Sequence, residues 1–287
     1  MMNEAIRITE SPRDAMQGLA NFIPTEDKIR YINALLRVGF DVIDFGSFVS
    51  PKAIPQMADT EQVLAGLNHE QSRSKLLVIV PNVKGAQMAA RHPAISFQGF
   101  PFSVSPTFLE RNIRSSVEKA WQTVLDIAGI CAKSGQEPVI YISMAFGNPY
   151  GDEWHPELVA HWVDRLVSAG VKRIKLSDTV GISSRKNIAR LFQLLVPAYP
   201  DVCFGLHLHT TIRHWYKKIN AAWQNGCRSF DTVINGLGGC PMAENRLVGN
   251  LRTSNLLEFC EVNNIPVNID DEAFEEAYRL ALEIFPS

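Results

Sequence analysis

The sequence predicts an α/β fold in which short strands alternate with amphipathic helices. Runs rich in β-branched residues recur along the chain, and longer stretches with helical spacing of apolar residues separate them. No charge block, proline-rich linker or low-complexity segment divides the 287 residues into two domains. Eight βα units with no extra strand at either end is the count expected of a (βα)8 TIM barrel, so we predict one such domain over residues 1–287.

The candidate strands follow the β-branched runs in order. They cover residues 5–9, 41–46, 76–80, 95–99, 139–143, 173–177, 202–207 and 229–234. Helical patterns lie between them, at 25–38 with an N-cap at Thr25 and an end before Gly39, at 113–134 with an end at Gly135, at 156–169 and at 186–196. A doubly wound open sheet is the alternative, but no Gly-x-Gly-x-x-Gly follows the first strand, so its nucleotide-binding form has no support.

Composition and charge argue against several classes of protein. Hydrophobic residues make up 46% of the chain and charged residues 20%, which are ordinary globular values. The net charge of −2 is too balanced for binding to nucleic acid through many phosphates. The longest apolar run, 76–81, is too short to span a bilayer, and the start is too polar for a signal peptide. Five scattered cysteines suit a reducing compartment, so we expect a soluble, cytoplasmic protein with no nucleic-acid or membrane partner.

In a TIM barrel the side chains that perform chemistry lie at the carboxyl ends of the strands. Polar residues at these ends come from separate segments, and the predicted fold brings them to one mouth of the barrel. They are Arg13, Asp14, Asp44, Ser47, Asn82, Ser143, Asp178, His207, His209, Asn235, Cys240 and Asn250.

The pair His207 and His209 is the sharpest local signal for metal binding. Side chains two apart on a strand point to the same face and can share one ion, although two packed or solvated histidines are the alternative interpretation. Asp14 and the amide oxygen of Asn250 would complete a mixed nitrogen and oxygen set without a thiolate. Such an open set favours Mg²⁺ or Mn²⁺, with Zn²⁺ or Co²⁺ as substitutes.

Three further residues of this mouth have two interpretations each. Arg13 could form a solvated ion pair with Asp14, or it could stabilise an oxyanion beside the metal. Asp178 fits the N-cap of the next helix as well as it fits a catalytic carboxylate. Cys240 belongs to the glycine-rich segment 236–241, whose composition favours a mobile lid that carries an acid or a base over a buried thiol.

These residues belong to motifs that resemble those of 3-hydroxy-3-methylglutaryl-CoA (HMG-CoA) lyases, members of the metal-dependent lyase and aldolase barrels. The resemblance runs from about Arg7 to Phe259. It is carried by Pro12-Arg13-Asp14 with Gln17, by Ser47-Phe48-Val49-Ser50-Pro51-Lys52 followed by Pro55-Gln56-Met57, by Pro81-Asn82-Val83-Lys84-Gly85, by Asp178-Thr179-Val180-Gly181, by His207-Leu208-His209, by Gly236-Leu237-Gly238-Gly239-Cys240-Pro241 and by Gly249-Asn250-Leu251.

The resemblance implies a catalytic domain, with a role for each residue of the mouth. It implies that a divalent metal is bound by Asp14, His207, His209 and Asn250, that Arg13 and Asp178 are catalytic, and that Cys240 is a lid cysteine. Asp44 stands where the family has a glutamate in the catalytic set. The implied substrate is an acyl-CoA, HMG-CoA, which a retro-Claisen step cleaves to acetyl-CoA and acetoacetate. In that step Arg13 stabilises the enolate, Asp178 or His207 removes the hydroxyl proton, and Cys240 protonates the enolate carbon. A homodimer is implied as well.

The chain departs from the family near these residues. Thr210-Thr211-Ile212-Arg213 replaces the usual Asp-Thr-Tyr-Gly, and segment 242–248 is one residue longer than usual. Thr9, Ala15 and Ser254 replace a glutamate, a glycine and an acidic residue. The alternatives are therefore a related aldolase, lyase or Claisen-type acyltransferase that acts on a different 3-hydroxy acid or acyl-CoA, a barrel metallohydrolase, and a barrel that binds without turnover. The Gly-Gly-Cys-Pro setting of Cys240 favours cleavage over condensation.

Overall fold

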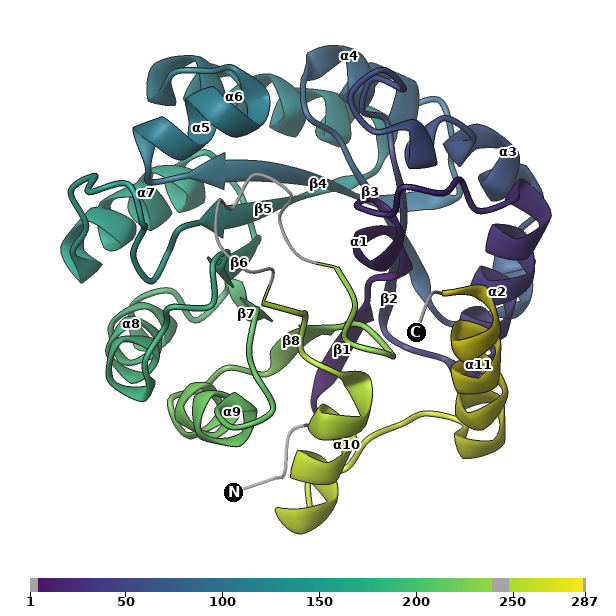
Figure 1. The fold of residues 1–287 in the computed structure, drawn as a ribbon. Coiled ribbons are helices and arrows are strands. Elements are labelled where there is room, and N and C mark those ends of the chain that lie inside the picture. The colour runs from purple at the N-terminus through teal and green to yellow at the C-terminus, as the bar shows by residue number, and fades with distance from the viewer. Residues whose placement is uncertain (1–4, 239–247, 286–287) are drawn as a thin grey trace.

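The computed structural model describes residues 5–238 and 248–285, and it is a closed barrel of eight parallel strands with helices around it (Figure 1). The strands pair in chain order from β1 to β8, and β8 closes the barrel by pairing with β1. The predicted TIM barrel is therefore confirmed. No helix among the described residues is long and apolar enough to cross a bilayer.

The strands are β1 (Arg7–Glu10), β2 (Val42–Ser47), β3 (Lys75–Ile79), β4 (Ile95–Ser103), β5 (Glu137–Ser143), β6 (Arg173–Asp178), β7 (Cys203–Leu208) and β8 (Ser229–Thr232). The α-helices are α1 (Pro12–Met16), α2 (Thr25–Val38), α3 (Thr60–Ala65), α4 (Val83–Ala89), α5 (Pro106–Ile113), α6 (Val117–Ser134), α7 (Pro156–Ser168), α8 (Arg185–Ala198), α9 (Trp215–Gln224), α10 (Thr253–Val262) and α11 (Asp271–Ile284). Two 3₁₀ helices, η1 (Pro55–Met57) and η2 (His69–Gln71), flank α3.

Helix α2 has the predicted bounds but not the predicted N-cap. It ends at Gly39, whose φ of 78° is a left-handed conformation that glycine adopts without steric cost. Pro24 occupies the N-cap position, while the Thr25 hydroxyl donates to Asp59 Oδ2 at 2.8 Å. The Thr25 side chain therefore ties α2 to the segment before α3 instead of capping its own helix.

The helix predicted over 113–134 is α6, which ends at Gly135 as predicted but begins four residues later, at Val117, because Ile113 is the last residue of α5. Arg114 has a left-handed backbone with φ of 52°, which ends α5, and Ser116 then caps α6 by accepting a hydrogen bond from the Lys119 N–H at 3.3 Å. The continuous apolar spacing across this point hid the break, because a serine cap inside a helical pattern is easily read as an exposed helix residue.

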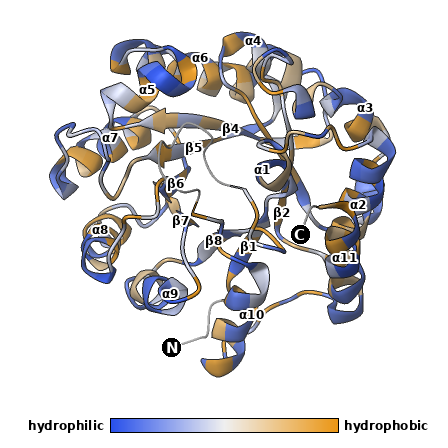
Figure 2. Ribbon diagram, in the orientation of Figure 1, coloured by the Kyte–Doolittle hydropathy of each residue, from blue (hydrophilic) through white to orange (hydrophobic). Residues whose placement is uncertain are grey.

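The hydrophobic core lies mainly between the barrel and its helices. In Figure 2 the outer helices carry both hydrophilic and hydrophobic residues, as expected when one face of each helix packs on the strands. A smaller cluster of Leu77, Phe97, Val139 and Tyr141 lies inside the barrel. Successive side chains on a strand point to opposite faces, so every second residue of each strand faces into the barrel. Several of the inward positions outside this cluster carry polar groups, and these form the site described next.

Candidate active site

Helix α1 places Arg13 and Asp14 directly beyond the carboxyl end of β1. Pro12 begins this single turn, where its missing N–H costs no helical hydrogen bond. The backbone N–H groups of Asp14 and Ala15 both bond to the Ser11 carbonyl, at 3.1 and 3.3 Å. Both charged side chains are buried, with Arg13 8% and Asp14 4% exposed, so the turn directs them into the barrel mouth.

His207 and His209 approach Asp14 from β7 and the residue just beyond its end, and β8 is the one strand between β7 and β1. His207 faces the barrel interior, and His209 forms an isolated antiparallel bridge with Asn250. One ligand atom each from Asp14, His207 and His209 lie within 4.8 Å of one another. The structure therefore brings together three of the four predicted metal ligands in a geometry that fits one cation.

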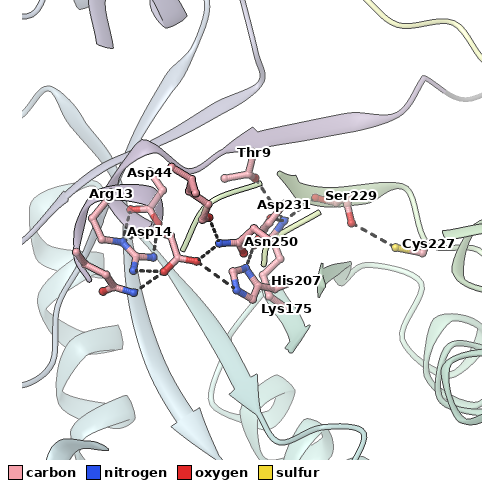
Figure 3. Close-up of polar contacts among 12 residues, drawn as sticks. Thr9, Arg13, Asp14, Asp44, Lys175, His207, Cys227, Ser229, Asp231 and Asn250 are labelled. Atoms are coloured by element: carbon pink, nitrogen blue, oxygen red, sulfur yellow. Dashed lines mark hydrogen bonds and ion pairs between the residues drawn. The ribbon is translucent and has the colours of Figure 1, made fainter. Parts of the chain in front are cut away.

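Asn250, the fourth predicted ligand, contacts this cluster through hydrogen bonds. Its Nδ2 donates to Asp14 Oδ2 at 2.8 Å and to the Leu237 carbonyl at 2.9 Å (Figure 3). In the described part of the chain no donor reaches its Oδ1. The side chain thus orients Asp14 and keeps an amide oxygen available at the site.

Each histidine is oriented by an acceptor at its Nδ1. His207 Nδ1 lies 3.2 Å from Asp231 Oδ2, and His209 Nδ1 lies 3.1 Å from the Val248 carbonyl. An N–H at Nδ1 leaves Nε2 as the nitrogen with a lone pair, which is the arrangement of metal-binding histidines. Both imidazoles can therefore present Nε2 to a shared ion.

The charges of the cluster favour a bound cation. Burial lowers the pKa of His209 to about 4, with the neighbouring His207 as the second cause. Burial also favours neutral His207, but the hydrogen bond and charge of Asp231 outweigh it and raise its pKa. For Asp14, burial opposes ionisation, yet Arg13 and the histidines hold its pKa below the usual value. The cluster thus holds an ionised carboxylate beside two imidazole nitrogens.

Arg13 is fixed by two carboxylates. Its Nη2 and Nε lie 2.5 and 3.1 Å from Asp44 Oδ2, and its Nη1 lies 3.1 Å from Asp14 Oδ1 (Figure 3). Burial raises the pKa of Asp44 to about 6, although the charge of Arg13 opposes this rise. Because both neighbours are buried, the exposed ion pair considered for Arg13 is not what the structure shows. The guanidinium is a preorganised cation at the mouth.

Asp178 ends β6 and is buried, but it does not cap a helix. The N-cap of α8 is Ser184, which forms a capping box with Asn187. Asp178 instead accepts hydrogen bonds from Ser183 and, at 2.9 Å, from Lys218 Nζ. Its charge opposes the lowering of the pKa of His209, so Asp178 is electrostatically coupled to the candidate metal cluster.

Other predicted residues of the mouth have structural contacts. Asn82 caps α4 by accepting from the Gly85 N–H, and Asn235 accepts from the Leu237 N–H in a turn. Ser47 donates to the Ile79 carbonyl, and the Ser143 carbonyl accepts from Ser103 Oγ. Cys240 and most of the divergent segment 242–248 lie outside the described residues, so their predicted roles stay predictions.

Three residues of the site were not predicted. Asp231 on β8 and Lys175 on β6 form a buried pair with Nζ–Oδ1 of 2.5 Å, and Tyr141 on β5 meets the His207 ring edge-on at 5.8 Å between centroids. All three face the barrel interior. Strand alternation could have identified them, once the inward register of each strand was known.

A cavity of about 270 Å³ lies beside the site, beyond the carboxyl ends of β2 and β3. Residues 47–51, 57, 58, 60 and 61 line one part of it, and residues 82, 84, 85 and 88 line the other. Lys84 supplies a cation at its wall, and Phe48, Met57 and Met88 supply apolar surface. The cavity therefore suits a ligand with both anionic and apolar parts.

Comparisons with known proteins agree with this arrangement. The HMGL-like family model matches residues 5–280. A cytoplasmic 3-hydroxy-3-methylglutaryl-CoA lyase of Rattus norvegicus is 32% identical over 276 residues, covering 96% of this chain and 79% of the relative. An (R)-citramalyl-CoA lyase of Chloroflexus aurantiacus is 31% identical, covering 93% of this chain and 87% of the relative. A solved HMG-CoA lyase from Acinetobacter baumannii, in complex with coenzyme A and 3-methylmalate, has a TM-score of 0.91 at 29% identity, covering 99% of this chain and 92% of that chain.

Proposed function

Since the chain belongs to the HMGL-like family and is an HMG-CoA lyase-like carbon–carbon lyase, we propose that it cleaves HMG-CoA to acetyl-CoA and acetoacetate with a divalent metal. The observation that supports this most is the convergence of Asp14, His207 and His209 beside the buried Arg13–Asp44 pair. It gives one mouth a cation site and a fixed guanidinium, the two electrostatic elements that an enolate-forming cleavage requires.

The donor set fits a hard divalent ion with open positions. Asp14, His207 and His209 would hold it, with the Asn250 amide oxygen as a fourth ligand, and no cysteine of the described residues belongs to the set. This chemistry favours Mg²⁺ or Mn²⁺ over a closed structural zinc, with Zn²⁺ and Co²⁺ as substitutes. Such an ion supplies Lewis acidity, which lowers the pKa of a substrate hydroxyl and polarises the carbonyl that develops.

Arg13 stabilises the enolate oxygen of the departing thioester. Asp44 fixes two of its nitrogens, so the guanidinium needs little reorganisation when negative charge develops on the substrate. Asp44 is shorter than the family's glutamate and still reaches Arg13 at 2.5 Å. It therefore positions the arginine.

We assign removal of the hydroxyl proton to Asp178 and proton delivery to the enolate carbon to Cys240. His207 is the other candidate base, but its Nδ1 faces Asp231 and its Nε2 lies 3.9 Å from Asp14 Oδ2. A metal held there would use the single lone pair of the neutral imidazole, whereas a carboxylate keeps further lone pairs beside its hydrogen bonds. Lys218 holds the Asp178 side chain in place from α9. A thiol is a suitable proton donor because cysteines in general ionise closer to neutral pH than hydroxyl groups do, and Cys240 belongs to a glycine-rich segment of the sequence.

The cavity beside the site supports an acyl-CoA substrate. Several of its lining residues belong to the motifs at 47–52 and 81–85, and Lys84 can contact an anionic group of a ligand. A related solved enzyme is described in complex with coenzyme A. The acyl group is less constrained, since relatives of similar identity are named citramalyl-CoA lyase and 3-hydroxy-3-isohexenylglutaryl-CoA/HMG-CoA lyase. A different 3-hydroxy-acyl-CoA is therefore the second candidate.

The test is a product assay on metal-loaded protein with a panel of 3-hydroxy-acyl-CoAs. We expect acetoacetate from HMG-CoA, its loss in EDTA and its return with Mg²⁺ or Mn²⁺. A different ketone product from another member of the panel would reassign the acyl group while keeping the lyase chemistry. If protein shown to hold metal released no product from any thioester, the proposed activity would be wrong.

We also propose that the enzyme acts in the cytoplasm as a homodimer. Cys131, Cys203, Cys227 and Cys260 are free thiols, which suits a reducing compartment. Light scattering on the purified protein tests the subunit count. A mass of one chain, 32.0 kDa, at working concentrations would contradict the dimer.

A further inference from the structure

A buried ammonium group lies inside the barrel beneath the candidate metal cluster. Lys175 is 6% exposed and extends from β6 toward β8. Its Nζ lies 2.5 Å from Asp231 Oδ1, 2.8 Å from Ser229 Oγ and 3.4 Å from Thr9 Oγ1 (Figure 3). A lysine has three N–H donors, so these contacts hold the whole group within the barrel.

Asp231 connects this ammonium group to a predicted metal ligand. One carboxylate oxygen accepts from Lys175, and the other lies 3.2 Å from His207 Nδ1. The strand register produces this chain of contacts, because His207 pairs with Asp231 across β7 and β8. Lys175, Asp231 and His207 therefore form one line of hydrogen bonds across three strands.

Gly205 is the residue that leaves room for Lys175. It pairs with Lys175 in the register of β6 and β7. A Cβ atom at Gly205 would lie 2.6 Å from Lys175 Cδ and 2.8 Å from Nζ, distances that real Cβ atoms do not show. A larger residue at position 205 would therefore displace the lysine side chain from the conformation in which Nζ reaches Asp231.

In the described part of the barrel, two buried cations contact different carboxylates. Arg13 contacts Asp44 and Asp14, while Lys175 contacts Asp231. Because Lys175 holds Oδ1 of Asp231, the other carboxylate oxygen is directed to His207 Nδ1.

We propose that Lys175 is a positioning residue for the metal site, which acts through Asp231 to fix the ring of His207 with Nε2 toward the cation. The inference rests on the proposed metal site. Outer hydrogen-bond partners of metal ligands typically change metal affinity by about 10-fold to 100-fold when they are removed. Lys175 is one contact further away and acts only while Asp231 is present.

The first test uses the metal-free protein, so it does not depend on the proposed function. ¹⁵N NMR of labelled histidine, at a pH where the ring of His207 is neutral, reports which ring nitrogen carries the proton, and His207→Gln assigns the signal. We expect a single Nδ1–H form in the parent protein and a mixture of forms in Lys175→Met. An unchanged His207 signal in Lys175→Met would overturn the proposal.

The second test is a double-mutant cycle on Mn²⁺ affinity, with Lys175→Met, Asp231→Asn and the double variant. We expect each single change to weaken Mn²⁺ binding by about 10-fold or more. On the Asp231→Asn background, Lys175→Met should have no further effect, because the contact through which it acts is gone. Losses that multiply in the double variant would contradict the relay. If Lys175→Met alone folds poorly, the double variant can still be compared with Asp231→Asn, because removing both charged partners leaves no unpaired buried charge.

Lys28 is the matched control. It also forms a buried lysine–aspartate pair, with Lys28 Nζ 2.8 Å from Asp59 Oδ1, but on α2 outside the barrel. Lys28→Met should lower the midpoint of unfolding while leaving Mn²⁺ affinity and the His207 signal unchanged. An equal loss of affinity in this control would show that any buried-pair defect suffices, and the proposal would fail. A parent protein that binds no Mn²⁺ would contradict the metal site, while the NMR result would still decide the relay.

Discussion

Two arginine–carboxylate pairs lie at opposite ends of the barrel and differ in their burial. At the carboxyl ends of the strands, Arg13 Nη2 and Asp44 Oδ2 are 2.5 Å apart, with side chains 9% and 1% exposed. At the amino ends, Arg173 Nε and Glu137 Oε2 are 2.9 Å apart, with side chains 32% and 53% exposed. An arginine and a carboxylate thus form a solvent-screened pair at one end and a desolvated pair at the other, and charges interact more strongly where water does not screen them.

The amino end also has a cavity, of about 250 Å³, lined by Arg7, Lys75 and Arg173 together with apolar side chains from inside the barrel. Arg7 and Lys75 are exposed, and the ligand cluster of the described residues lies at the other end. A cavity with cations is therefore not enough to locate the chemistry. Burial and convergence of the charged groups distinguish the two ends.

Substitution of the two arginines should show the largest contrast. Arg13→Gln should lower turnover by about 10³-fold or more, because it removes a contact made mainly in the transition state, while metal occupancy stays intact. Arg173→Gln should leave turnover within about twofold, since no step requires it. The measurements are steady-state kinetics and metal content of both variants. Full turnover by Arg13→Gln would refute its assigned role.

Two glutamates give the next contrast, in stability against pH. Burial raises the pKa of Glu10 from 4.5 to about 7, although hydrogen bonds from Thr253, Ile234 and Thr232 oppose the rise. Because the folded pKa lies above the unfolded one, Glu10 contributes stability that is complete below pH 4.5 and is lost as pH rises through 7. The upper bound is on the order of 3 kcal/mol.

Unfolding of Glu10→Gln between pH 5 and pH 8 measures this contribution. The parent protein should lose stability relative to the variant as pH rises, whereas Glu137→Gln, exposed at the amino end, should follow the parent curve. Parallel curves for the parent and Glu10→Gln would show that Glu10 has an ordinary pKa.

Two cysteines test the lid assignment. Cys240→Ser should slow turnover by about 10²-fold with the metal still bound, because it replaces the proposed proton donor with a much weaker acid. Cys203, which accepts from Arg7 Nη1 at 3.3 Å at the amino end, is the control, and Cys203→Ser should leave the rate unchanged. Equal rates for Cys240→Ser and the parent would show that Cys240 is not the proton donor.

The smallest expected effect is the stability cost of the exposed pair. Arg173→Gln should change the free energy of unfolding by no more than about 1 kcal/mol, as surface ion pairs do. Urea titration of the variant measures it. A loss several times larger would mean that the contact of Arg173 with the Phe97 ring, at 4.6 Å, makes the amino end a structural anchor.

The sequence predicted the barrel and most residues that gather at its mouth, because both follow from local patterns. Strand-like runs and the rule that chemistry lies at carboxyl ends were enough to select Arg13, Asp14 and His207. Lys175 and Asp231 were missed, since each looks like an ordinary polar residue until the register shows that it faces inward. Register is a tertiary property, and alternation alone leaves two choices for each strand.

Asp178 shows the same limit in another way. Its position before a helix made an N-cap as reasonable as a catalytic role, and local sequence could not decide between them. The capping box of Ser184 and Asn187 removed the first interpretation, and the contact with Lys218 lies 40 residues away in sequence. Contacts at that separation are set by packing.

The central claim is that Asp14, His207 and His209 share one divalent ion. The most direct measurement is a crystal structure of the protein grown with Mn²⁺, with anomalous diffraction used to locate the metal. We predict one strong peak within bonding distance of those three side chains, with the Asn250 amide oxygen as a fourth contact. A mouth without manganese at saturating concentration, or a peak that leaves the three side chains uncoordinated, would contradict the account.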